Sequence, residues 1–121
     1  KGAAMLTPAS GQRVYIATGS TDMRKAINGL SILVESRMGL DAFSGQIFVF
    51  SNRRRNMIKV LYWEHNGFCL WQKRLERERF RWPERAEEVV RVSSRQLRWL
   101  LDGLELVQGR AHRQLQYRSV M

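Results

Sequence analysis

Residues 62–76 read YWEHNGFCLWQKRLE, and this stretch decides the fold. Asn66-Gly67 between alternating apolar residues is the strongest short-range signal for a tight hairpin turn. We therefore expect a strand over residues 57–63, a turn over 64–67 and a returning antiparallel strand over 68–75. The residues that would face each other across this ladder are Tyr62, Trp63, Phe68 and Cys69.

The sequence before the hairpin predicts two strands with a helix between them. Residues 13–17 are β-branched and aromatic, and residues 46–50 form a short apolar run typical of a buried strand. Apolar residues at helical spacing predict an amphipathic helix over residues 21–38, with Thr21 as its N-cap. Gly29 inside this helix indicates close packing against the sheet, because glycine otherwise weakens a helix by roughly 1 kcal/mol.

The segment that follows the hairpin, residues 73–82, admits two interpretations. As a strand it places arginines on one face and Phe80 with Trp82 on the other, whereas as a helix it has only a poor apolar stripe. We expect a strand with a turn over residues 76–78. The arginines that would share one face are Arg77, Arg79 and Arg81.

The last part of the chain predicts a short strand over residues 88–92 and a helix over residues 94–104. Ser93 and Gln96 have the spacing of a capping box, which marks the start of a helix. Trp99 lies off the apolar stripe of this helix. Either the core wraps around this side chain, or the side chain contacts a partner. The stripe itself consists of Leu97, Leu100, Leu101 and Leu104.

These elements indicate an α+β fold, with a mainly antiparallel sheet of about five strands. The first helix packs on one face of the sheet, and the C-terminal helix closes the domain. Residues 5–108 are long enough for one domain with a single modest core. Residues 1–4 resemble an expression remnant ahead of Met5, and the polar residues 109–121 are expected to form a flexible tail.

Charge is the outlier of the composition. The net charge is +10, and 17 of the 21 basic residues are arginine. Residues 53–85 carry ten cations and four carboxylates, so this region holds +6 of the +10. Such a local excess of arginine favours recognition of phosphate or carboxylate groups. Nucleic acid, an acidic protein and an anionic membrane surface are the partner classes that fit; a basic band without a ligand is the alternative.

The chain lacks the residue patterns of common catalytic sites. Its acidic residues are scattered singly rather than clustered for metal ions, and no glycine-rich phosphate loop or nucleophile motif is present. Cys69 is the only cysteine, which excludes an internal disulfide and a cysteine zinc cluster. No apolar run is long enough to span a membrane, and no signal peptide is visible. We therefore expect a cytoplasmic, nucleoid-associated protein that is not an enzyme and has no metal or cofactor.

A DNA-binding surface is the first functional hypothesis, because cations can meet phosphates while nearby aromatic rings stack on bases. One phosphate-contacting edge would consist of Arg53, Arg54, Arg55 and Lys59. An adjoining ridge would consist of Lys73, Arg74, Arg77, Arg79 and Arg81. Arg24 and Lys25, near the predicted helix start, would either add an anion site or simply be solvated. Single-stranded RNA would suit the same surface.

A protein adaptor is the second hypothesis, since tryptophan and arginine dominate the energetics of protein interfaces. The candidate contacts are Trp71, Trp82 and Trp99. The alternative is that these tryptophans fill the core of a small domain. Phe48, Phe50 and Phe68 are all expected in the core.

Several motifs resemble, in order and spacing, the small accessory protein of a class of bacterial insertion sequences, a family often labelled TnpB. This family is unrelated to the RNA-guided nuclease of the same label. The resemblance covers about residues 5–106, and it departs at Glu78, where the family often has glycine. The motifs are Thr21-Asp22-Met23-Arg24-Lys25, Phe43-Ser44-Gly45, Phe48-Val49-Phe50, Arg53-Arg54, Lys59-Val60-Leu61-Tyr62-Trp63, Gly67-Phe68, Lys73-Arg74-Leu75-Glu76 and Phe80-Arg81-Trp82-Pro83.

The resemblance implies a helper in DNA transposition that is encoded beside a separate, large transposase. In such elements the transposase carries the catalytic carboxylates, which agrees with their absence from this sequence. The implied partners are DNA, either the element ends or non-specific sequence, and the transposase. Homo-oligomers are compatible with this role.

Overall fold

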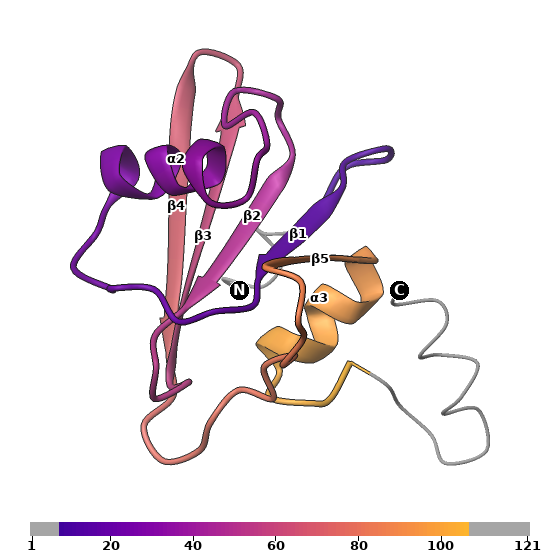
Figure 1. Ribbon diagram of the computed structural model, residues 1–121. Helices are drawn as coiled ribbons and strands as arrows, with labels where there is room; N and C mark the ends of the chain where they lie inside the picture. Colours follow the sequence, from indigo (N-terminus) through magenta and orange to yellow (C-terminus); the bar gives the residue numbers. More distant parts are fainter. Residues whose placement is uncertain (1–7, 107–121) are drawn as a thin grey trace.

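The computed structural model describes residues 8–106; the expected remnant over residues 1–4 and the expected tail over residues 109–121 lie outside them. The chain forms a five-stranded sheet with the strand order β4-β3-β2-β1-β5 (Figure 1). Strands β1 and β2 are parallel, and every other pair is antiparallel. The predicted α+β class with a mostly antiparallel sheet is confirmed. In chain order the elements are β1 (Val14–Ala17), α2 (Ile27–Ser36), β2 (Ile47–Ser51), β3 (Met57–Glu64), β4 (Gly67–Arg74), β5 (Val89–Val92) and α3 (Ser94–Leu101).

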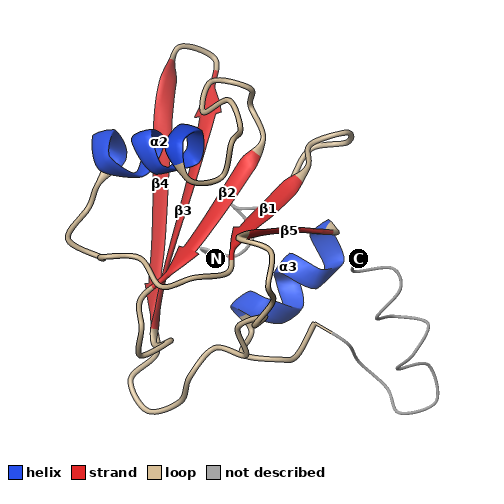
Figure 2. Ribbon diagram, viewed as in Figure 1, coloured by secondary structure: helices blue, strands red, loops and turns tan. Residues whose placement is uncertain are grey.

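The two helices cover opposite faces of the sheet, so the domain has two apolar cores (Figure 2). Strand β2 serves both cores because successive side chains of a strand point to opposite faces. Ile47 and Val49 pack with the α3 core, and Phe48 and Phe50 pack with the α2 core. This position explains why the first four residues of the strand are all apolar. In residues 8–106, no helix has the length and apolar character needed to cross a membrane.

The predicted hairpin is confirmed. Trp63 pairs with Phe68, and Tyr62 pairs with Cys69. The two turn residues are His65 and Asn66, and Gly67 already belongs to β4. His65 adopts a left-handed φ of 58°, which is the conformation that a tight turn requires here.

Helix α2 begins at Ile27 rather than at Thr21, and it ends at Ser36. The predicted N-cap is wrong because the Thr21 N–H donates to the carbonyl of Ser51, 2.8 Å away, which ties this residue to the end of β2. Asp22 then accepts a 2.9 Å hydrogen bond from the Arg24 N–H and forms a local turn that competes with a helix. Residues 18–26 are therefore a non-helical segment.

The expected packing of Gly29 against the sheet is also wrong. A Cβ atom placed at Gly29 would lie 3.1 Å from the Cβ atom of Lys25. The close neighbour of Gly29 is therefore Lys25, in the segment that precedes the helix.

Residues 75–88 connect β4 to β5 and do not form a strand, contrary to the favoured interpretation of residues 73–82. The N–H groups of Leu75 and Phe80 donate to the carbonyls of Asn56 and Arg55, at 2.8 and 2.7 Å, instead of forming a ladder. The connection, which we call the strap, leads from one edge of the sheet to the other (Figure 1).

Helix α3 has the predicted capping box at its start. Ser93 accepts from the Gln96 N–H, and the Gln96 side chain accepts from the Ser93 N–H. The helix ends at Leu101, earlier than predicted, and Gly103 follows with a φ of 81°, the left-handed conformation that stops a helix. Leu104 therefore leaves the apolar stripe and is 45% exposed.

Candidate nucleic-acid interface

Three chain segments meet at the end of the sheet where β1, β2 and β4 finish: residues 18–26, the β2–β3 loop over 52–56, and the strap (Figure 1). Backbone hydrogen bonds hold them together. The Thr21 N–H reaches the end of β2, and the Phe80 N–H of the strap reaches the loop. Residues far apart in sequence thus form one continuous end of the molecule.

Exposed cations gather on these segments and on the last residue of β4. We call the surface that they form the basic end. Its members are Arg24, Lys25, Arg53, Arg54, Arg74, Arg77, Arg79 and Arg81. The carboxylates of the same segments, with the whole strap included, are fewer: Asp22, Glu76, Glu78, Glu84, Glu87 and Glu88. The balance is positive, as an anion-binding surface requires.

Part of this charge is already paired. Arg24 forms a 2.7 Å ion pair with Asp22, and Arg74 lies 3.3 Å from Glu76. The hydrogen bonds from the Arg24 side chain and backbone hold the pKa of the Asp22 carboxyl well below its usual range.

The remaining arginines of the basic end differ in whether they form an ion pair with a carboxylate. Arg81 makes a longer contact of 3.8 Å with Glu105. Arg53, Arg54, Arg77 and Arg79 form no ion pair with any residue of the described range 8–106. These four arginines are therefore the cations best placed to bind an external anion.

Arg55 belongs to the same loop but turns inward. Its guanidinium donates to the carbonyl of Thr18 at 3.1 Å, makes longer hydrogen bonds to the carbonyls of Gly19 and Asn52, and lies 5.5 Å from the ring centre of Trp82. Burial lowers the pKa of Arg55, and the backbone takes a left-handed φ of 59°. The residue links the loop to residues 18–19 rather than facing solvent.

Two of the three lysines predicted to contact phosphate, Lys59 and Lys73, also donate to backbone carbonyls inside the domain. Lys59 is only 8% exposed, and its Nζ atom donates to the carbonyls of Met23 and Lys25 at 2.7 and 2.8 Å. Lys73 donates to the carbonyl of Leu101 at 2.8 Å, where a cation suits the negative end of helix α3. We therefore exclude Lys59, Lys73 and Arg55 from the basic end.

The tryptophans predicted as partner contacts have different surroundings. Trp82 is 8% exposed and donates from Nε1 to the carbonyl of Ala17 at 3.0 Å, which makes it part of the α3 core. Trp71 is half-buried against the same core, and Trp99 is half-buried on α3. Of these side chains, Trp82 is the one that has no surface to offer a partner.

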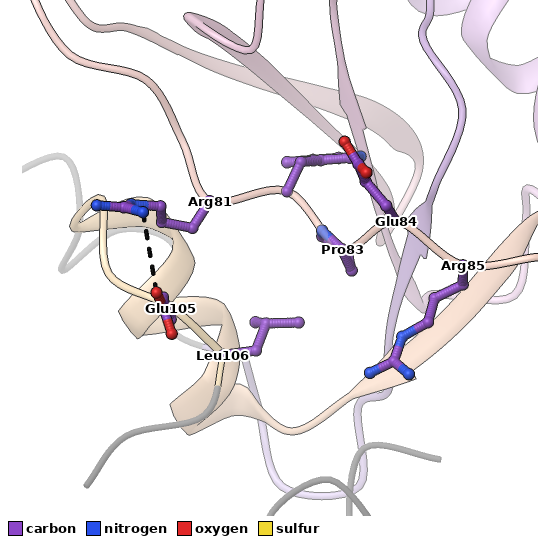
Figure 3. Close-up of a pocket in the computed structure, with 7 residues that line it drawn as sticks. Arg81, Pro83, Glu84, Arg85, Glu105 and Leu106 are labelled. Carbon is purple, nitrogen blue, oxygen red and sulfur yellow. Dashed lines mark ion pairs between the residues drawn. The ribbon is translucent and has the colours of Figure 1, made fainter. Parts of the chain in front are cut away.

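A pocket of about 460 Å³ lies between the strap and the residues after α3 (Figure 3). It carries both signs of charge, because Arg81 and Arg85 line it together with Glu84 and Glu105. The mixed lining does not favour a phosphate ion over a cation. Within residues 8–106, no cluster of three His, Cys, Asp or Glu side chains could hold a metal ion.

The opposite end of the sheet carries an aromatic cluster that the sequence did not reveal. The rings of Phe43, Trp63 and Phe68 lie 5.0–5.1 Å from one another. Phe43 is 56% exposed, and Phe68, expected in the core, is only half-buried. Phe43 joins the cluster through the loop between α2 and β2, a contact that no sequence periodicity could indicate.

Comparison with known proteins identifies the family. A family model described as "IS66 Orf2 like protein" matches residues 12–111, which include the whole basic end. The chain is 39% identical over 101 residues to "Uncharacterized protein y4hO" of Sinorhizobium fredii, covering 84% of this chain and 88% of the relative. It is 34% identical over 101 residues to "Uncharacterized protein y4jC" of the same organism, covering 84% and 86%. No solved structure matches. This chain therefore belongs to the IS66 Orf2-like family, whose members are accessory proteins of IS66 insertion sequences.

Proposed function

We propose that this protein is a non-catalytic accessory factor that binds DNA through the basic end during transposition of its element. The observation that carries this proposal is the convergence of exposed, unpaired arginines from two separate segments. Arg53 and Arg54 come from the β2–β3 loop, and Arg77 and Arg79 come from the strap. Phosphate groups along a duplex backbone suit such a surface, since guanidinium groups bind phosphate in a bidentate manner.

The attachment of these loops to the rest of the domain supports binding to DNA rather than a non-specific attraction to any polyanion. Arg55 and Phe80 fix the loop and the strap to each other and to β1, so the arginines hold a defined spacing. Phosphate contacts of this kind position a protein on DNA without specifying sequence. A preference for the element ends would need additional contacts to bases.

The test is a fluorescence anisotropy titration with a duplex that carries the terminal repeat of the element, and with a scrambled duplex, across a salt series. If about five phosphates are neutralised, the log–log slope of affinity against salt should be roughly −4.5. Replacing both Arg53 and Arg54 by alanine should weaken binding and make this slope shallower by roughly 1.8. Single-stranded RNA, added as a competitor, separates DNA binding from RNA binding.

The matched control replaces Arg95 and Arg98 by alanine. These arginines are exposed on helix α3, outside the basic end, and their loss removes the same charge. Binding should be nearly retained in this control. Equal losses in both variants would show that net charge alone governs the interaction, and no binding by the wild-type protein at low salt would rule out DNA contact by this chain alone.

A second candidate function is docking of the separate transposase, and the exposed Phe43 in the aromatic cluster favours it. Exposed aromatic rings are common anchors in protein interfaces. Replacing Phe43 by lysine should then weaken co-purification with the transposase and leave DNA affinity unchanged. If the Phe43→Lys protein binds DNA and also co-purifies with the transposase as well as the wild-type protein does, this candidate function is excluded.

A further inference from the structure

Strand β4 is an edge strand of the sheet, and along this edge its backbone is unpaired. It spans Gly67–Arg74 and pairs only with β3. Natural proteins usually protect an edge strand of this length with charges, prolines or a covering loop. Here Lys73 and Arg74 are the charged residues of the strand, and both lie at its end. The preceding residues, GFCLWQ, are uncharged.

The ladder register identifies which backbone groups face outward. The Leu75 N–H donates to the carbonyl of Asn56, which flanks the Met57–Arg74 pair. In an antiparallel ladder, hydrogen-bonded and non-hydrogen-bonded pairs alternate from such a fixed point. The groups that point away from β3 therefore belong to Phe68, Leu70, Gln72 and Arg74. None of them forms a hydrogen bond with another residue in the described range 8–106.

We propose that a second copy of this chain pairs antiparallel with β4 and joins the two sheets into one. A two-fold axis at Trp71 pairs Phe68 with Arg74 of the other copy, and Leu70 with Gln72 of the other copy. Each outward N–H and carbonyl then finds a partner. Two-fold symmetry of this kind is the commonest arrangement of homo-oligomers.

Charge complementarity favours the antiparallel second copy. Parallel pairing in register would place Lys73 and Arg74 against the same cations, which is destabilising. In the antiparallel register, Arg74 meets the ring of Phe68, a favourable cation–π arrangement. Lys73 lies opposite Cys69 in this register, and its ammonium group donates to the Leu101 carbonyl of its own copy. The antiparallel register thus keeps the cations of the two strands apart.

The proposed pairing also fits the positions of the helices and of the basic end. Helices α2 and α3 cover the two faces of the sheet, so the edge of β4 stays open for a backbone partner. Apart from Arg74, the members of the basic end lie beyond β4, whereas the proposed axis passes through the middle of this strand. Dimer formation therefore leaves the other seven cations of the basic end exposed.

The first test measures molar mass by light scattering after size-exclusion chromatography, without DNA and at high salt, because each copy carries a charge of +10. Wild-type protein should have twice the mass of one chain. Gln72→Pro removes an outward N–H without disturbing the pairs with β3, and proline is tolerated at such edge positions. This variant should be monomeric, and Gln72→Ala should remain dimeric. A wild-type monomer at every concentration, or a dimeric Gln72→Pro protein that is folded by circular dichroism, would overturn the proposal.

The second test is disulfide trapping, which does not depend on how well a proline variant folds. Lys73→Cys should form an oxidised dimer with Cys69 of the other copy, because opposed residues of this register lie within disulfide range. The two positions of one chain are about 13 Å apart along the strand, too far for an internal bond. The same variant with Cys69→Ser is the control and should stay unlinked. Equal trapping in both proteins would contradict the register.

Discussion

The ammonium group of Lys59 lies 2.8 Å from the backbone carbonyl oxygen of Lys25, so one lysine holds the chain segment that exposes the other. Strand β3 is thereby bound to the segment that directly precedes helix α2. These two cations come from separate sequence motifs and have opposite roles, because Lys59 is buried and Lys25 is exposed.

Replacing Lys59 by methionine should lower the free energy of unfolding. The carbonyls of Met23 and Lys25 would lose their donor, which costs roughly 1–3 kcal/mol where water cannot replace it. Urea unfolding of Lys59→Met beside Lys25→Met, whose side chain is exposed, measures the difference. Wild-type stability together with weaker DNA binding in Lys59→Met would instead indicate that Lys59 contacts phosphate.

The adjacent residues Arg54 and Arg55 should separate DNA affinity from stability. Arg54→Ala should make the salt slope of DNA binding shallower by about 0.9 while leaving the melting temperature unchanged. Arg55→Ala removes hydrogen bonds to Thr18 and the contact with Trp82, so it should lower stability by roughly 1–3 kcal/mol. Thermal melts and salt titrations of both variants provide the measurement, and the reverse pattern would contradict the assignment.

Neutralising the carboxylates of the strap should strengthen DNA binding. Glu76 and Glu78 lie among the arginines of the basic end and repel phosphate. The double variant to glutamine should bind roughly three- to tenfold more tightly, since exposed charges contribute up to about 1 kcal/mol each. The control, Asp41→Asn with Glu64→Gln, removes the same charge at the opposite end of the sheet. A comparable gain in the control would mean that the basic end has no special part in binding.

Stability should fall at alkaline pH as Tyr62 ionises. Partial burial, followed by the Cys69 thiol, raises the pKa of Tyr62 above its ordinary value of 10.0. The folded state therefore holds this proton more tightly than the unfolded state, so the contribution is complete below pH 10 and is lost as pH rises through the folded pKa. Urea unfolding at stepped pH should show a smaller alkaline loss in Tyr62→Phe. A difference absorbance titration with its midpoint at or below 10 would contradict the shift.

Local patterns in the sequence were sufficient for several elements. The hairpin was predictable because Asn66-Gly67 interrupts an alternating pattern. The start of α3 was predictable because the side chains of Ser93 and Gln96 each accept a hydrogen bond from the backbone N–H of the other residue. The five strands and the two-helix arrangement followed from such signals. Each depends on residues close together in the chain.

The errors arose where distant backbone groups decided the outcome. Thr21 and Asp22 are residue types typical of a helix start. The Thr21 N–H donates to the carbonyl of Ser51 instead, and the helix begins at Ile27. The sequence of the strap predicts a strand because its side chains do alternate: Phe80 and Trp82 are buried while Arg79 and Arg81 are exposed. Its hydrogen-bond partners, however, are loop carbonyls.

The inward cations were the hardest feature to predict. Lys59 and Arg55 donate to carbonyls that lie more than thirty positions earlier in the chain. The one available signal was weak: Lys59 shares a strand face with Leu61, which is fully buried. A cation in such a position is expected to find acceptors inside the protein.

The strap joins β4 and β5, the two outermost strands, and Phe80 and Trp82 anchor it in the α3 core. Any pulling force on Arg77 or Arg79 is therefore divided between both margins of the sheet instead of peeling one strand away. A domain built in this way should resist mechanical unfolding through the strap, and it should unfold as a whole rather than strand by strand.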